Sequence, residues 1–239
     1  METSLDGVLL IDKPSGCTSH DVVDHIRRRF KFKKVGHCGT LDPMATGLLM
    51  LVLGKATKVQ DLLMAEDKEY QGTLKLGEST DSQDAQGLVL EKKDVPPFSQ
   101  EEIIAAFDAF KGDFYQLPPM VSALKKDGVP LYKLARQGKS VEREPRLVHV
   151  FYYQILEQNL PSIRFTLKCS KGFYVRTYCH DIGARLGCGG HLSQLTRTRS
   201  GNFNLSQALS MDQLDHYTHP GDLAQHILTL AQVSQIRRQ

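Results

Sequence analysis

Residues 68–77, KEYQGTLKLG, alternate between side chains that suit a protein core and side chains that suit water. In an extended chain, the even-numbered residues from Tyr70 to Leu76 fall on one face and the odd-numbered residues between them fall on the other. A period of two is typical of a β-strand and incompatible with a helix of 3.6 residues per turn. The pattern therefore predicts a strand over 68–77, and with it a sheet.

Other segments also have strand character, and several of them follow one another without a helix between. Further strands are expected at Gly7–Ile11, Leu88–Glu91, Val148–Leu156, Ile163–Cys169 and His191–Gly201. The apolar run Leu48–Leu53 is either a buried strand or the start of a buried helix. Because strands and helices do not alternate strictly, we expect an α+β fold with a mixed, mostly antiparallel sheet flanked by helices.

Two helices begin with recognisable capping residues. Thr18 and Asp21 resemble a capping box, and Ser99 with Glu102 forms another, in a helix that Gly112 would end. The first helix would bury residues at helical spacing, namely Val22, Val23, Ile26 and Phe30. Further helices are expected at 55–64, 131–138 and 175–187.

The chain is expected to form one domain over residues 1–210, with an irregular insertion at about 113–147 and a short C-terminal tail at 211–239. The insertion is rich in Pro, Gly, Lys and Arg. Long excursions in compact domains are usually functional or disordered. The tail is helical in pattern and too short to be an independent domain.

The formal charge is +3, but the basic residues are clustered. The run RRRFKFKK occupies residues 27–34. A second basic region comprises Lys125, Lys126, Lys133, Arg136, Lys139, Arg143 and Arg146. Either run alone would be read as a solvated face, whereas two such runs in a weakly charged chain favour a polyanionic partner.

The cysteines and the apolar runs indicate a compartment. Five cysteines, an odd number without a CxxC motif, are typical of a reduced cytoplasm. The longest apolar run, GLLMLVLG, is far shorter than a membrane span, and Gly7–Ile11 is too short for a signal sequence. We expect a cytoplasmic protein with no membrane partner.

Several motifs of cofactor-dependent and metal-dependent enzymes are missing from the sequence. There is no P-loop, no GxGxxG after a strand, no zinc-deaminase pattern and no His/Cys cluster with zinc spacing. We therefore expect neither a cofactor nor a metal. Cys38 beside His37 leaves thiol catalysis open. Asp12 and Asp42 could in principle supply the two carboxylates of a glycosidase.

The segment GHCGTLDPMATG, residues 36–47, holds a single acid, Asp42, between Leu41 and Pro43 and among three glycines. A solvated loop would accept almost any polar residue at this position. A carboxylate in so constrained a setting is therefore a candidate for chemistry. Together with the basic runs, it favours a redox-neutral reaction performed by side chains on a polyanion.

Five segments occur in the order seen in one known family: GVLLIDKPSGCTSHDVV, GHCGTLDPMATGLL, DKEYQGTLKLGESTDSQDAQG, LPPMVSALKKDGVPLYKLARQG and CSKGFYVRTYCHDIGARLGCGGHLSQLTRTRSG. In turn they resemble the N-terminal signature, the active-site motif, the second motif, the RNA-binding insertion and the last catalytic motifs of the bacterial TruB family of tRNA pseudouridine synthases. The resemblance runs from about Gly7 to Gly201.

The resemblance implies the pseudouridine synthase fold and the isomerisation of one uridine, at position 55 in the T-loop of tRNA. The glycosidic bond breaks, the uracil turns, and a C–C bond forms to the same sugar without a cofactor. By motif position, Asp42 is the catalytic nucleophile or base. Arg176 is its ion-pair partner, and Tyr70 stacks on the extruded base.

Other residues match positions that surround the substrate in that family. His37 resembles the histidine that fills the gap left by the flipped base. Tyr174 and Leu195 match substrate-pocket positions. Lys13 and Pro14 match a flanking motif and are expected to be structural rather than catalytic. The implied partner is the T-arm stem-loop of tRNA, bound by a monomer.

The chain departs from the family pattern at two places. Cys38 stands where the family usually has a small polar residue or glycine, and we expect this to be tolerated. The C-terminal PUA-type domain of most relatives is expected to be absent or vestigial, which would weaken contacts to the acceptor arm.

Two rival functions remain from the sequence. A non-catalytic RNA-binding protein or tRNA chaperone could use the same fold, although binding alone requires no such set as Asp42, Tyr70 and Arg176. A nucleoside N-glycosidase would release free base, and no second acid is identified for it.

Overall fold

The computed structural model describes residues 5–122, 124–126, 128–135, 137–139 and 141–238. The chain divides into two compact units, which we call unit 1 (Met1–Tyr70 with Thr196–Gln239) and unit 2 (Gln71–Leu195). Strands β4 (Lys68–Leu76) and β12 (Gly190–Ser200) each begin in one unit and end in the other. The mixed, mostly antiparallel sheet flanked by helices is confirmed.

Unit 1 is built around strands in the order β14–β1–β3–β12. Strand β1 (Gly7–Lys13) pairs antiparallel with β3 (Thr46–Leu53) along its whole length. The other elements are α1 (Ser19–Phe30), β2 (Val35–His37), η1 (Gly54–Val59), α2 (Gln60–Met64), β13 (Phe203–Asn204), η2 (Leu205–Gln207), β14 (Leu209–Ser210), α6 (Met211–Asp215), η3 (Pro220–His226), β15 (Ile227–Leu228) and α7 (Leu230–Arg238).

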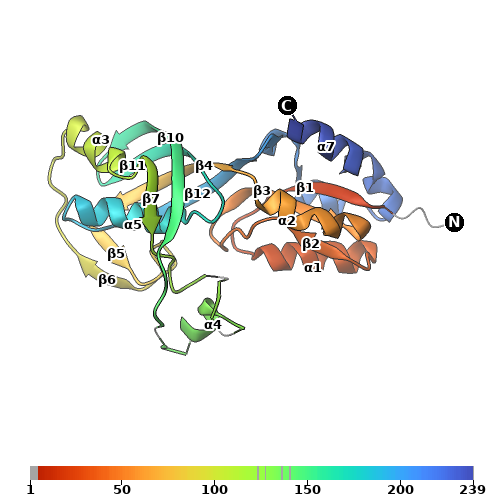
Figure 1. The fold of residues 1–239 in the computed structure, drawn as a ribbon, viewed down its shortest axis with the longest axis horizontal. Coiled ribbons are helices and arrows are strands. Elements are labelled where there is room, and N and C mark those ends of the chain that lie inside the picture. The colour runs from red at the N-terminus through yellow and green to blue at the C-terminus, as the bar shows by residue number, and fades with distance from the viewer. Residues whose placement is uncertain (1–4, 123, 127, 136, 140, 239) are drawn as a thin grey trace. The chain divides into compact units, whose positions relative to one another are not determined.

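The apolar run at Leu48–Leu53 is a strand, buried along its whole length because both of its faces are covered. Side chains of one face, such as Met50, pack with Leu63 of α2 and Val233 of α7. In Figure 1, β1 runs between α7 and α1. The capping box of Thr18 and the buried stripe of α1 are confirmed.

The pattern of the tail predicted helix, and the tail also contains a strand. It contributes the short strand β15, which is antiparallel to β1, whereas β14 lies just before the tail at Leu209–Ser210 and is parallel to β1. Strands of two residues carry no periodicity, so only the pairing with β1 reveals them.

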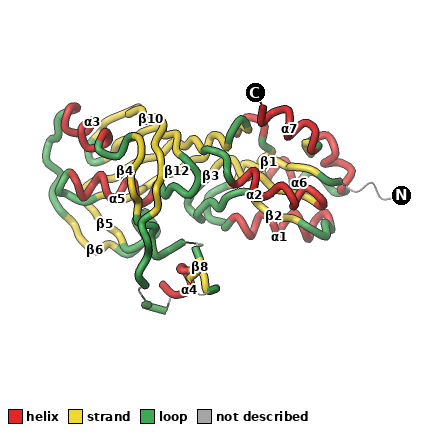
Figure 2. Tube along the Cα trace, viewed as in Figure 1, coloured by secondary structure: helices red, strands yellow, loops and turns green. Residues whose placement is uncertain are grey.

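Unit 2 contains strands in the order β12–β4–β11–β10–β7. Its other elements are β5 (Glu78–Thr80), β6 (Val89–Lys92), α3 (Gln100–Asp108), β7 (Gly112–Gln116), β8 (Lys125–Lys126), β9 (Val129–Pro130), α4 (Leu131–Ala135), β10 (Arg146–Asn159), β11 (Ser162–Cys169) and α5 (Val175–Arg185). Figure 2 shows α3 and α5 beside these strands.

Aromatic side chains join the helices of unit 2 to its strands. The ring of Phe107 in α3 lies 5.6 Å from that of Phe165 in β11 and 5.8 Å from that of Tyr178 in α5. The alternation predicted for β4 is confirmed by its burial. Gly72 occupies a core position of β4 because a Cβ there would lie 2.7 Å from the Phe165 ring.

The irregular segment begins later than predicted. Residues from Asp113 to Gln116 belong to β7, which pairs with β10, so the expectation of an irregular chain from Asp113 is wrong. The pairing partner lies beyond the insertion, and a short strand shows itself only once that partner is known. The expected short helix is present as α4. Arg136, counted in the second basic region, lies outside the described residues.

Candidate active site

Asp42 lies in the connection between β2 and β3, and the backbone before it is tied to α1. The Leu41 amide donates to Ser19 Oγ at 2.8 Å, and Ser19 Oγ donates to the Leu41 carbonyl at 3.1 Å. The Ala45 amide donates to the Asp42 carbonyl at 3.0 Å. The side chain of Asp42 is half-buried. The first helix thus fixes the position of the catalytic candidate.

The backbone after Asp42 is held by a buried lysine. The Pro43 carbonyl accepts from the Gly16 amide at 2.8 Å and from Lys13 Nζ at 3.4 Å. Lys13 Nζ also donates to the carbonyls of Pro14 and Cys17. Burial lowers the pKa of Lys13, while the charges of Cys17 and Asp42 oppose that shift. Lys13 therefore brings a cation into the vicinity of Asp42.

Arg197 of β12 is a further buried cation, and sequence reasoning missed it. Its Nε donates to the Leu48 carbonyl at 2.7 Å, and its Nη2 donates to the Gly39 carbonyl at 3.1 Å. In the sequence TRTRSG, Arg197 and Arg199 look alike. Periodicity places both on one face of the strand and does not show which is enclosed.

His37 and Cys38 precede the loop. Burial, and then the charge of Arg197, lower the pKa of His37, which favours a neutral ring. Its Nδ1 is buried and has no hydrogen-bond partner among the described residues. Burial raises the pKa of the Cys38 thiol to about 12. A thiol that stays protonated is a poor nucleophile, so thiol catalysis by Cys38 is disfavoured.

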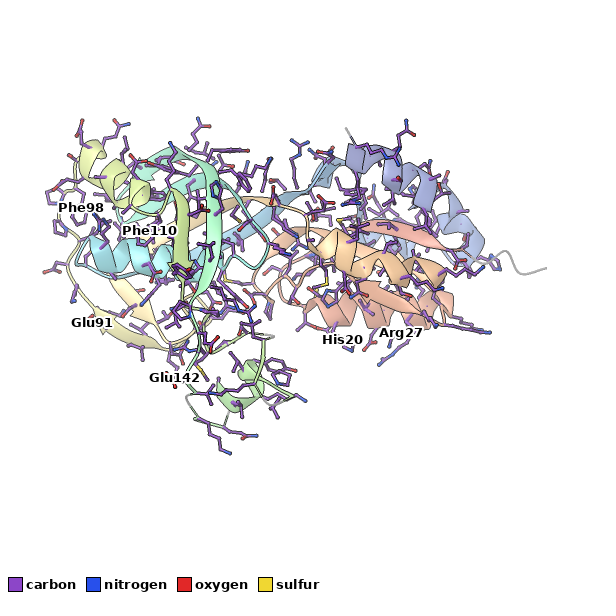
Figure 3. The ribbon with its side chains drawn as sticks, in the orientation of Figure 1. His20, Arg27, Glu91, Phe98, Phe110 and Glu142 are labelled. Atoms are coloured by element: carbon purple, nitrogen blue, oxygen red, sulfur yellow. The ribbon has the colours of Figure 1, made fainter. Side chains whose placement is uncertain are left out.

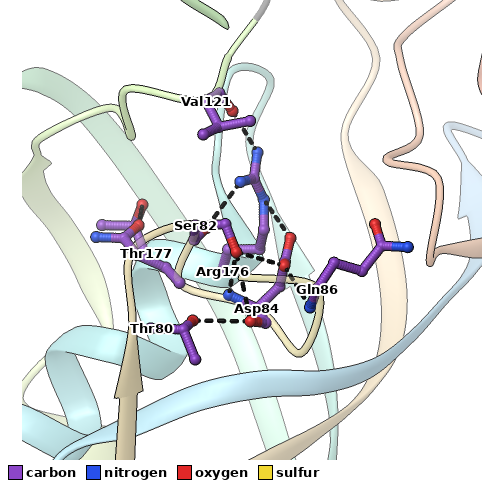
Figure 4. Close-up of polar contacts among 8 residues, drawn as sticks. Thr80, Ser82, Asp84, Gln86, Val121, Arg176 and Thr177 are labelled. Carbon is purple, nitrogen blue, oxygen red and sulfur yellow. Dashed lines mark hydrogen bonds and ion pairs between the residues drawn. The ribbon is translucent and has the colours of Figure 1, made fainter. Parts of the chain in front are cut away.

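In unit 2, Arg176 occupies the first turn of α5 and is almost fully buried. Its Nε lies 3.7 Å from Asp84 Oδ2, and its Nη1 and Nη2 donate to the carbonyls of Ser82 and Val121 at 2.9 and 2.8 Å (Figure 4). Sequence reasoning missed Asp84, because DSQDAQG carries no signal beyond that of a polar loop.

Asp84 is itself held firmly. Its Oδ1 accepts from Ser82 Oγ at 2.6 Å and from the Gln86 amide at 3.0 Å, and its carbonyl accepts from Thr80 Oγ1 at 2.7 Å (Figure 4). The loop between β5 and β6 therefore holds the Asp84 carboxylate in a fixed position beside Arg176.

The remaining candidate residues of the site lie on strands or directly before a helix. Tyr174 precedes α5, and its amide and carbonyl both bind the side chain of the buried Gln116, at 2.8 and 3.1 Å. Tyr70 on β4 and Leu195 on β12 are mostly buried. His37, Asp42 and Tyr70 belong to unit 1, whereas Tyr174, Arg176 and Leu195 belong to unit 2.

The described residues contain no group of three or more His, Cys, Asp or Glu side chains placed to hold a metal ion. Among the described residues, no helix is both long enough and apolar enough to cross a membrane.

The unit 1 part of the site has a carboxylate, that of Asp42, on a loop that is held by hydrogen bonds and lies near buried cations. This arrangement suits a nucleophile or a base.

Two family models match the chain. The model of the TruB family pseudouridylate synthase N-terminal domain matches residues 27–175, and that of the tRNA pseudouridylate synthase B C-terminal domain matches residues 176–230. A tRNA pseudouridine synthase B from Opitutus terrae is 56% identical over 88% of this chain and 88% of its own length. That from Syntrophotalea carbinolica is 47% identical over 95% of this chain and 74% of its own.

Two solved structures also resemble this chain in fold. A Cbf5-Nop10-Gar1 complex matches 90% of this chain with a TM-score of 0.70 and 33% identity. An H/ACA RNP bound to a substrate RNA containing 2'-deoxyuridine matches 90% with a TM-score of 0.67 and 31% identity. The chain spans 56% and 54% of those two chains, a little over half of each.

Proposed function

Because the chain belongs to the TruB family of pseudouridylate synthases, which are isomerases, we propose that it converts the uridine at position 55 in the T-loop of tRNA to pseudouridine. The bond between N1 and the ribose C1′ breaks, the uracil turns, and C5 bonds to the same C1′. The hydrogen of C5 leaves as a proton and N1 gains one, so the product is an isomer of uridine and no oxidant or reductant is needed. The proposed enzyme works as a cytoplasmic monomer without a metal or cofactor.

The observation that carries the proposal is the fixation of Asp42 from both sides. Ser19 binds the residue before it, and Gly16 and Lys13 bind the residue after it. A carboxylate held in this way loses little entropy when it meets a substrate, and such positioning is a major source of catalysis. Asp42 acts either as the nucleophile or as the base.

Other side chains have supporting roles in this proposal. Arg176 pairs with Asp42 and keeps its carboxylate aimed. Tyr70 stacks on the extruded uracil, and Tyr174 and Leu195 line the pocket around it. His37 fills the place in the T-loop that the uridine leaves. The neutral ring favoured by its lowered pKa suits a position among RNA bases.

The basic run at the end of α1 is proposed to bind tRNA phosphates. Figure 3 shows His20 and Arg27 on the outer side of α1. Arg28, Lys33 and Lys34 are also exposed. Phosphate contacts of this kind read shape rather than sequence.

The test is to incubate the purified protein with an unmodified tRNA transcript in the presence of EDTA and without nucleotides. We expect pseudouridine at one T-loop uridine, detected by carbodiimide labelling and primer extension. Asp42→Asn should bind the same tRNA and convert none of it. The matched control is Asp61→Asn, which alters an exposed aspartate of α2 and should keep full activity.

Each rival function has its own outcome in this assay. A binding protein without catalysis would leave the uridine unchanged in every sample. An N-glycosidase would release free uracil and leave an abasic site. Turnover by Asp42→Asn would refute the role of Asp42 and leave the reaction itself standing.

A further inference from the structure

Arg197 is among the largest fully buried side chains of the protein, with 1% of its surface exposed. Burying a guanidinium is costly because its charge leaves water and all its donors need partners. An arginine that only supported the strand could be replaced by an apolar residue without this cost. The positions of its hydrogen-bond partners indicate why the buried guanidinium is useful to the fold.

The two carbonyls that Arg197 binds lie on either side of Asp42. Gly39 lies just after the end of β2, and Leu48 lies near the beginning of β3. One rigid guanidinium, held on β12, therefore spans the connection that carries Asp42. The planar fork of arginine suits such a bridge, whereas lysine provides a single point of charge.

Two glycines lie close to Arg197, Gly39 in the connection and Gly47 at the beginning of β3. Gly47 has φ of +98°, and a Cβ there would lie 2.4 Å from the Arg197 carbonyl oxygen. Gly39 has φ of +92°, and a Cβ there would lie 3.3 Å from Arg197 Nη1. A side chain at Gly47 would therefore collide with the β12 backbone, and a side chain at Gly39 would crowd the Arg197 guanidinium.

We propose that Arg197 is a positioning residue for Asp42: it closes the loop by bridging Gly39 to Leu48 and so holds the carboxylate in its reactive place. The inference rests on the proposed function of Asp42. It assigns Arg197 no contact with the RNA. Its loss should therefore slow the chemical step and leave the binding of tRNA nearly unchanged.

The experiment compares Arg197→Lys and Arg197→Met with the matched control Arg199→Met. Arg199 lies two residues further along β12, and its side chain is 41% exposed. The single-turnover rate of pseudouridine formation is measured with enzyme in excess, together with the Kd for tRNA. A misplacement of about 1 Å can cost about 100-fold in rate. We expect a loss on the order of 10- to 100-fold for Arg197→Met and a smaller loss for Arg197→Lys.

Hydrogen exchange provides a readout that a general loss of stability would not reproduce. The Leu41 amide donates to Ser19 Oγ of α1, and the Ala45 amide donates to the Asp42 carbonyl within the loop. They should exchange faster in both Arg197 variants, while amides of α3 and α5 in unit 2 stay protected. The Kd for tRNA should change less than about threefold, a change below 1 kcal/mol.

Several outcomes would overturn the inference. These are equal rates in wild type and Arg197→Met, a loss confined to Kd, or faster exchange spread over the whole chain. The proposed function is tested separately by the wild-type protein. If the wild type forms no pseudouridine, that function fails, and the exchange of Leu41 and Ala45 still reports whether Arg197 holds the loop.

Discussion

Asp84 and Arg176 illustrate how single residues are held in unit 2. Both are almost fully buried, and the carboxylate of one lies beside the guanidinium of the other. Arg176 also donates to the carbonyl of Val121, so it links the loop between β5 and β6 to the beginning of the insertion. A neutral residue at either position would leave a buried charge without this partner.

We expect Asp84→Asn to lower the free energy of unfolding by about 3 kcal/mol, the lower end of the range for breaking a buried pair. Urea denaturation measures this effect, and the single-turnover rate should fall as well because Arg176 loses its orientation. Glu91→Gln is the control, since it removes an exposed carboxylate from the neighbouring β6. Equal unfolding midpoints for the two variants would contradict the prediction.

Among the elements, the hairpin of β5 and β6 is anchored to β4 by a shared carboxylate. Glu78 of β5 lies 2.9 Å from Lys75 Nζ of β4 and 3.0 Å from Lys92 Nζ of β6. These hydrogen bonds, that of Lys75 first, lower the pKa of Glu78 to about 2. The hairpin carries the loop of Asp84, so its anchor supports the site.

This anchor predicts a dependence of stability on pH. A carboxyl whose pKa is lowered by folding contributes stability above its unfolded pKa of 4.5 and loses it as the pH falls toward about 2. Wild type should therefore exceed Glu78→Gln in Tm at about pH 7, and the difference should shrink below about pH 4. A constant difference across the acid range would show that Glu78 stabilises by packing alone.

Across the whole molecule, part of the basic run at the end of α1 makes contacts within the protein. Arg27 is paired with Asp24 at 2.9 Å. The guanidinium of Arg29 donates to the carbonyls of Asp215 and Tyr217 and so joins the tail to α1. Arg28, between them, is exposed. Only part of the run therefore remains for a polyanion.

Substitution of Arg28 and of Arg29 should separate the proposed binding of phosphates from the attachment of the tail to α1. Arg28→Ala should weaken tRNA binding and lower the slope of log Kobs against log salt by about 1, the effect of losing one phosphate contact. Arg29→Ala should mainly lower Tm, because the tail loses its contacts with α1. Fluorescence titration at several salt concentrations and thermal melting measure the two effects. Identical salt slopes for wild type and Arg28→Ala would remove Arg28 from the RNA surface.

Local patterns predicted the local structure well. The capping residue Thr18 and the buried stripe of α1 follow from spacing within one helix, and the alternation around Tyr70 follows from the pleat of one strand. The constrained setting of Asp42 could also be read from its neighbours in sequence. The short strands β14 and β15 could not, because the strand they pair with among the described residues is β1, near the other end of the chain.

The sequence by itself determined where helices begin, which strand faces are apolar and which acid stands in the glycine-flanked loop, since each depends on residues a few positions apart. Only the tertiary structure decided that Arg197 is enclosed while the Arg199 side chain is partly exposed, and that Arg176 lies beside Asp84. Those contacts join segments distant in the chain. The energy that selects them comes from burial and charge pairing, which exist only after the chain has folded.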